Sequence, residues 1–159
     1  MKKTASLFFA IFGLISAHAF ALTHMETAEL LHQAELVAVG YTISVDQGVD
    51  TAQAQVQLLQ VLKGRGEAPG SLLTVVTNGG KVFIDESQPN FMTRQTNLLF
   101  LQKTPEGYTC VNQADGQKVI RGEFVYPYHD NLAYSIPLKD YLESLAAAMK
   151  VSSASQAHH

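Results

Sequence analysis

The sequence predicts a mostly β fold: a small, largely antiparallel barrel with helices packed against it. Three observations favour this class. About five strand-like segments, bounded by turn residues, lie between a short helical segment and a longer one. Gly40 interrupts the first strand, as at a barrel corner. Residues 51–63 change their hydrophobic phase partway, as the bent strands of small barrels do. A β-sandwich is the alternative.

The first predicted elements are a helix over residues 23–34 and a strand over residues 36–45. Thr23 and Glu26 have the spacing of a capping box at the start of the helix. In the strand, apolar residues alternate with small or polar ones. Because Gly40 lies in mid-strand, we expect a bulge or a tight bend there.

The second predicted strand, residues 51–63, shifts its apolar residues from one face to the other. A one-residue slip moves every side chain to the opposite face, so the shift requires a bulge or a strand covered on both sides. The two successive apolar sets are Ala52, Ala54, Val56 and Leu58, then Leu59 and Val61. We therefore expect a long, bent strand that ends at Lys63-Gly64.

A third strand is predicted at residues 71–77, with residues 81–84 as a hairpin arm and residues 85–95 as a polar loop. Residues 97–103 contain four successive apolar residues, which is typical of a strand buried on both faces.

Asp115-Gly116 is a strong hairpin signal. It predicts that the strands flanking it, residues 108–112 and 117–121, pair with each other.

The C-terminal region changes to helical periodicity over residues 136–150. An amphipathic helix is expected to pack its apolar face on the barrel, because its polar face is not rich in Lys or Arg, as that of a membrane-surface helix would be. The apolar face consists of Leu138, Tyr141, Leu142, Leu145 and Met149. Residues 151–159 are predicted to be a disordered tail.

The N-terminus has the three parts of a secretory signal peptide. A basic start is followed by an apolar run over residues 7–16 and by small-x-small sites that end at Ala19 and Ala21. We predict a signal peptide over residues 1–21, cleaved after Ala19 or Ala21, and one domain over residues 22–150. The mature protein is expected in the periplasm or secreted, without a membrane span. A retained membrane anchor is the alternative, for which the apolar run is short.

Charge and cysteine content narrow the function classes. Removal of Lys2 and Lys3 with the signal peptide leaves nine basic against 14 acidic residues, a net charge of −5. The remaining basic residues are scattered, so we expect no nucleic-acid binding.

Cys110 is the one cysteine and cannot form an internal disulfide. We expect it to be a small buried hydrophobe; an intermolecular disulfide or a reactive thiol is the alternative.

Four segments carry a family resemblance in their order and spacing. They are "AELVAVG" (34–40), "AQVQLLQVLKG" (54–64), "LLTVVTNGG" (72–80) and "TNLLFLQKTPEGY" (96–108). Together they resemble the netrin-like (NTR-like) domain, over about half of the chain. The tissue inhibitors of metalloproteinases carry this domain, as do exported bacterial proteins of unassigned function. The resemblance implies an OB-fold barrel.

The sequence also departs from that family. Eukaryotic members are tied by disulfides, and the inhibitors place an N-terminal Cys on the zinc of the protease. Here the first residue after cleavage would be Phe20 or Leu22. That mechanism therefore does not carry over, and a protease-inhibitor-like module without the N-terminal Cys remains only an alternative function.

Without a recognisable catalytic motif, we expect a non-enzymatic binding or accessory module of the cell envelope that needs no cofactor. The loops at residues 64–70 and 85–95 are the expected contact surfaces, with Phe91 as an aromatic anchor and with Arg65 and Arg94 as further candidate binding residues. The partner would be a protein or another envelope component. A hydrolase-type enzyme that uses His129 is a rival hypothesis, although a loop histidine at that position is the simpler interpretation.

A metal site is the other alternative. Cleavage after Ala21 would leave Leu22-Thr23-His24 at the N-terminus. The free amine, two backbone amides and the imidazole of His24 could then form a square-planar nitrogen site for Cu(II) or Ni(II). Cleavage after Ala19 removes this site.

Overall fold

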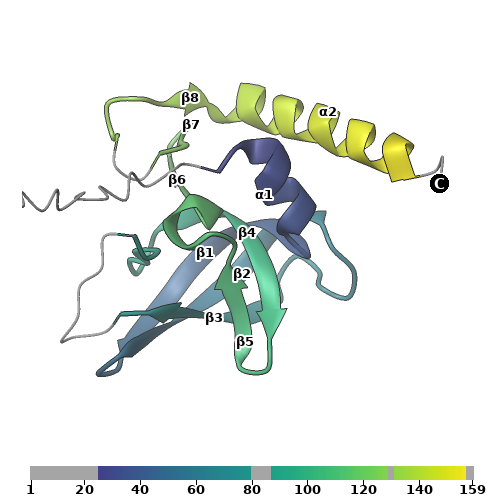
Figure 1. Ribbon diagram of the computed structural model, residues 1–159. Helices are drawn as coiled ribbons and strands as arrows, with labels where there is room; N and C mark the ends of the chain where they lie inside the picture. The colour runs from purple at the N-terminus through teal and green to yellow at the C-terminus, as the bar shows by residue number, and fades with distance from the viewer. Residues whose placement is uncertain (1–24, 80–86, 129–130, 157–159) are drawn as a thin grey trace, which may run out of the picture.

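The computed structural model describes residues 25–79, 87–128 and 131–156 of the 159-residue chain. Strands dominate, with a short helix before them and a long one after them (Figure 1). The predicted arm at residues 81–84 lies outside the described residues. In chain order the elements are α1 (Thr27–Gln33), β1 (Leu36–Gln47), β2 (Thr51–Lys63), β3 (Leu72–Asn78), β4 (Thr96–Thr104), β5 (Gly107–Cys110), the 3₁₀ turn η1 (Gln113–Gly116), β6 (Gln117–Arg121), β7 (Phe124–Tyr126), β8 (Ile136–Pro137) and α2 (Leu138–Gln156).

Five strands close into a barrel. The order is β1-β2-β3-β5-β4, and β4 returns to pair with β1. The β1–β4 seam is antiparallel and includes the pair Leu36↔Leu101, whereas β3 and β5 run parallel and meet at Val75↔Tyr108. The small OB-type barrel with a helix at each end of the chain, expected from the sequence, is therefore confirmed.

A sheet extension leaves the barrel at β4. β6 pairs with β4, β7 with β6 and β8 with β7, all antiparallel. β5 and β6 follow one another along the same edge of β4, and η1 joins them without reversing the chain. The predicted hairpin of residues 108–112 and 117–121 is therefore wrong. β5 closes the barrel against β3 instead of pairing with β6, and Asp115-Gly116 lies inside η1.

The two faces of the barrel wall bury two apolar clusters. β4 contributes to both, because Leu99 and Leu101 pack inside the barrel while Leu98 and Phe100 pack against the helices. All four side chains are fully buried, so the prediction of a strand covered on both faces is confirmed. The barrel interior contains Leu36, Ala38, Ala54, Val56, Leu58, Leu73, Val75, Phe91, Leu99, Leu101, Tyr108 and Cys110.

The phase shift of β2 comes from a bulge. The register with β1 skips Leu59, which is the extra residue of β2. Val56 and Leu58 face the barrel interior before the bulge, and Val61 packs against the same cluster after it. The expectation that Leu59 shares a buried face with Val61 is wrong, because Leu59 points outward after the inward Leu58 and the bulge returns only Val61 to the interior.

Gly40 lies at this irregularity, as predicted, because the register shifts between Val39 and Gly40. A Cβ on Gly40 would overlap the side chain of Val56 and lie 3.5 Å from Leu99 Cδ1. We expect Gly40→Val to lower the free energy of unfolding by about 2 kcal/mol, since the added methyl groups must push the barrel wall apart. Urea denaturation followed by circular dichroism measures the change. An unaltered midpoint would contradict this account of Gly40.

The helix α1 is shorter than the predicted helix over residues 23–34. Glu26 is its N-cap residue rather than its third residue, and the Glu26 side chain makes no capping hydrogen bond. With Glu26 at the N-cap, the helix starts three residues later than the predicted capping box requires, and Thr23 itself lies outside the described residues. The backbone N–H of Met25 instead donates to Asp115 Oδ2 at 2.9 Å, which ties the start of α1 to η1.

The helix α2 is longer than predicted. It continues to Gln156, so residues 151–156 of the expected disordered tail are helical, and residues 157–159 lie outside the described residues. The sequence after Lys150 contains no Gly or Pro that would stop the helix. Tyr141 and Leu145 are buried in the cluster that α2 shares with α1 and the barrel wall, as the amphipathic pattern predicts.

Candidate functional site

One part of the outer barrel wall is not covered by the helices: the second half of β1, the middle of β2 and the start of β3. The helices pack on the first residues of β1, on β4 and on Leu62 near the end of β2, whereas β3 contributes no residue to their apolar cluster (Figure 1). On this surface Ile43 is 43 %, Leu59 50 % and Leu72 62 % exposed. The register places Tyr41, Gln57 and Leu72 side by side across the three strands. We call the surface defined by Tyr41, Ile43, Gln57, Leu59 and Leu72 the open sheet face.

Two bulges lie within the open sheet face. Leu59 is the extra residue of β2, and Ile43 is the extra residue of β1 between Thr42 and Ser44. Leu58 and Thr42 are buried, so ordinary alternation points the next residues, Leu59 and Ile43, outward; each bulge then returns the strand to the interior phase at Val61 and Val45. The phase shift in the sequence of β2 indicated a bulge, but it did not show that Leu59 itself would be the exposed residue.

The open sheet face has no charged residue near its centre. β2 has none before Lys63, and β3 has none at all. Its polar groups are amides and hydroxyls; for example, Gln55 Nε2 donates to Thr74 Oγ1 at 2.9 Å across β2 and β3. An amide both donates and accepts hydrogen bonds, so this face suits a neutral surface better than an ion.

The two predicted binding arginines lie far apart along β1, one beside its middle and one near its start. The backbone N–H of Arg94 donates to Thr42 O at 2.8 Å, which places this exposed residue at the edge of the open sheet face. Arg65 is also exposed and follows Gly64, which approaches Leu36 at the start of β1. Six residues of strand separate these positions, or about 20 Å. The structure therefore does not bring the two arginines together.

Phe91 is not the exposed anchor that its position in a polar loop suggested. It is 7 % exposed and belongs to the apolar cluster inside the barrel. The side chain of Gln117 holds the neighbouring backbone: Asn90 N–H donates to Gln117 Oε1 at 2.8 Å, and Gln117 Nε2 donates to Asn90 O at 3.1 Å. The loop is thus fixed with Phe91 turned inward.

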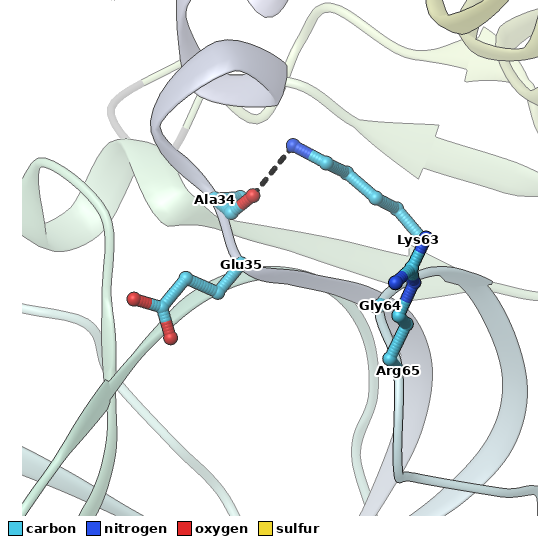
Figure 2. Close-up of a pocket in the computed structure, with 5 residues that line it drawn as sticks. All are labelled: Ala34, Glu35, Lys63, Gly64 and Arg65. Carbon is cyan, nitrogen blue, oxygen red and sulfur yellow. Dashed lines mark hydrogen bonds between the residues drawn. The ribbon is translucent and has the colours of Figure 1, made fainter.

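Lys63 and Gly64 have a structural role at a shallow depression lined by Ala34, Glu35, Lys63, Gly64 and Arg65. Figure 2 shows Lys63 reaching toward Ala34, while Glu35 points away from it. Lys63 Nζ donates to Ala34 O at 2.6 Å and also to Leu31 O, the carbonyls at the end of α1. A cation at the C-terminal end of a helix satisfies free carbonyls and interacts favourably with the helix dipole. This ammonium group is therefore engaged within the fold.

A buried group that the sequence analysis missed lies behind η1. Lys118 is 4 % exposed, and burial lowers its pKa to about 8, although the nearby Asp115 carboxylate opposes this shift. Asp115 accepts hydrogen bonds from Met25 N–H at 2.9 Å and from Asn112 Nδ2 at 2.7 Å. Burial raises the pKa of the neighbouring Cys110 thiol to about 12, so this cysteine is the buried hydrophobe that was expected.

The remaining candidate residues fall outside the described part of the chain. Leu22, Thr23 and His24 precede it, and His129 lies in the gap at residues 129–130, so the copper or nickel site and the histidine enzyme remain untested hypotheses. Within the described residues, no group of three His, Cys, Asp or Glu side chains could hold a metal ion.

No family model matches the chain, and neither does any curated protein. The NTR-like resemblance therefore stays a prediction. Of the helices in the described ranges, none is both long and apolar enough to span a membrane.

Proposed function

We propose that this protein is an exported, non-enzymatic binding module of the cell envelope, built on an NTR-like barrel, and that it binds a protein partner through the open sheet face. The observation that carries the proposal is the exposure of Ile43, Leu59 and Leu72 on a part of the barrel wall that the helices do not cover. The barrel is fully formed without these three side chains, because its interior cluster contains none of them.

The composition of the face supports a protein partner. The centres of protein interfaces are depleted in charged residues and enriched in apolar and aromatic ones. Leu59 and Leu72 are diagonal neighbours on β2 and β3, with Tyr41 on the next strand, so the apolar side chains form one group. Grouped apolar exposure of this kind marks interaction sites more often than scattered single residues do.

The surroundings supply a polar rim. Arg94 lies beside Thr42 at one edge, and the turn that contains Arg65 leaves the end of β2. Exposed charges at a rim influence the rate and orientation of association more than its strength. On this proposal the two predicted arginines assist docking, while the affinity comes from the uncharged centre.

Site-specific photo-crosslinking tests the proposal. A photoreactive amino acid in place of Gln57 should capture a discrete protein species when the chain is exported in its own cells. Leu59→Glu should reduce that capture at least about tenfold, because it places a charge in a desolvated apolar contact. Its matched control is Leu132→Glu, an equal change at an exposed leucine between β7 and β8. Both variants should keep the wild-type circular dichroism spectrum. Equal capture by Leu59→Glu and Leu132→Glu would refute this surface as the binding site.

A further inference from the structure

We propose that the occupant of the open sheet face is the same face of a second copy of this chain, so that the protein forms a two-fold symmetric dimer. This inference rests on the proposed function, because it names the partner of the same surface. A two-fold contact joins one patch to itself, which requires a patch that is complementary to its own copy.

Charge is the first reason. The mature chain carries a net charge of −5 if the signal peptide is removed, so two copies repel each other over most orientations. The strands β2 and β3 carry no charged residue apart from Lys63, whose ammonium group binds the end of α1. The centres of two such faces can approach without opposing like charges, which would otherwise cost several kcal/mol or suppress the contact, while Arg94 lies at the edge of the face and Asp46 toward the end of β1.

Self-complementary chemistry is the second reason. Gln57 lies between Tyr41 and Leu72 in the register, and its amide can donate to and accept from an identical amide. Leu59 and Leu72 supply aliphatic side chains that a second sheet at about 10 Å would cover. The same residues therefore serve as both sides of the contact.

The size of the face predicts the strength of the dimer. Three strands over about six residues span about 14 Å by 20 Å, or about 280 Å² per copy and about 560 Å² for the two faces together, which is less than half the area of a standard specific interface. A face of this size fits a weak dimer whose population depends on concentration. Such a dimer is populated when the protein is concentrated and dissociates on dilution.

Sedimentation velocity on the chain purified from the envelope fraction tests the inference. Between about 1 and 500 µM, the sedimentation coefficient should rise from that of a monomer to that of a dimer. Added salt should not weaken the dimer, because it screens the net negative charge and no ion pair holds the contact. Leu59→Glu and Leu72→Glu should each raise the dissociation constant at least about tenfold. Leu132 is exposed in a different part of the chain, two residues from the exposed Tyr134. Leu132→Glu should therefore leave the dissociation constant of the dimer unchanged.

Each other outcome overturns the inference. A chain that stays monomeric over the whole range excludes the second copy, and the proposed function survives if Gln57 still crosslinks to a different protein. Crosslinking at Gln57 to a glycan would exclude both the second copy and a protein partner. A dimer that persists in both open-face variants, or that Leu132→Glu dissociates, would use another surface. If Leu59→Glu does not fold, Leu72→Glu decides the question, since that side chain is more exposed.

Discussion

Replacing Phe91 with alanine is expected to lower the free energy of unfolding by about 3–4 kcal/mol and the melting temperature by about 10 °C or more. The reason is that Phe91 packs inside the barrel with Leu99, Leu101 and Tyr108, and its removal leaves a cavity at the barrel end. Thermal and urea denaturation of the purified variant measure both quantities. Phe91→Leu keeps most of the buried volume and should lose about 1 kcal/mol.

The adjacent Met92 is the matched control, because it lies in the same loop with its side chain exposed. Met92→Ala should change the stability by less than about 0.5 kcal/mol. The same variants separate core packing from binding at residue 91. If Phe91→Ala unfolds at the wild-type urea concentration and yet loses the crosslinked partner, then Phe91 is an interface residue and the barrel-interior assignment is wrong.

Strand positions could be predicted well because the chain fixes them by local pattern. The bounds of β2, residues 51–63, agree with the structure, since turn residues flank a long alternating run. The four successive apolar residues of β4 correctly indicated burial on both faces. It was harder to predict which strands pair with each other, because pairing depends on segments that are distant in the sequence. Asp115-Gly116 predicted a hairpin, but β4 offers one edge to both β5 and β6, and this competing partner is not visible locally.

The predictions about individual site residues were wrong for a related reason. A loop sequence shows that Phe91 lies between strands, but the direction of its side chain depends on the long-range contact between Asn90 and Gln117. Leu59 was assigned to the buried face because the phase shift located a bulge only to within a residue or two. Lys118 could have been found, since strict alternation in β6 places it on the same face as the apolar Ile120.

That buried lysine leads to an expected pH dependence of stability. The pKa of Lys118 falls from 10.5 to about 8 on folding, mainly through burial. Between these two values the unfolded chain binds more protons than the folded one, so Lys118 makes stability rise with pH. A pKa shift of this size raises the free energy of unfolding by about 3 kcal/mol between about pH 8 and pH 10.5. Cys110 acts in the opposite direction, because its pKa rises from 9.0 to about 12 and the unfolded thiol ionises first.

The two groups together give a stability profile that can be measured. Wild-type stability should increase from about pH 8 to 9, where only Lys118 titrates, and then level off as the Cys110 term begins to cancel it. In Lys118→Met the increase should be absent and stability should fall above about pH 9. The difference between wild type and Lys118→Met should therefore change by about 3 kcal/mol between pH 7.5 and 10.5. Lys139→Met, which changes a highly exposed lysine of α2, is the matched control and should follow the wild-type profile. Urea midpoints at four or five pH values provide the measurement. Parallel profiles for wild type and Lys118→Met would show that Lys118 keeps its ordinary pKa, and hence that its ammonium group reaches water in the folded protein.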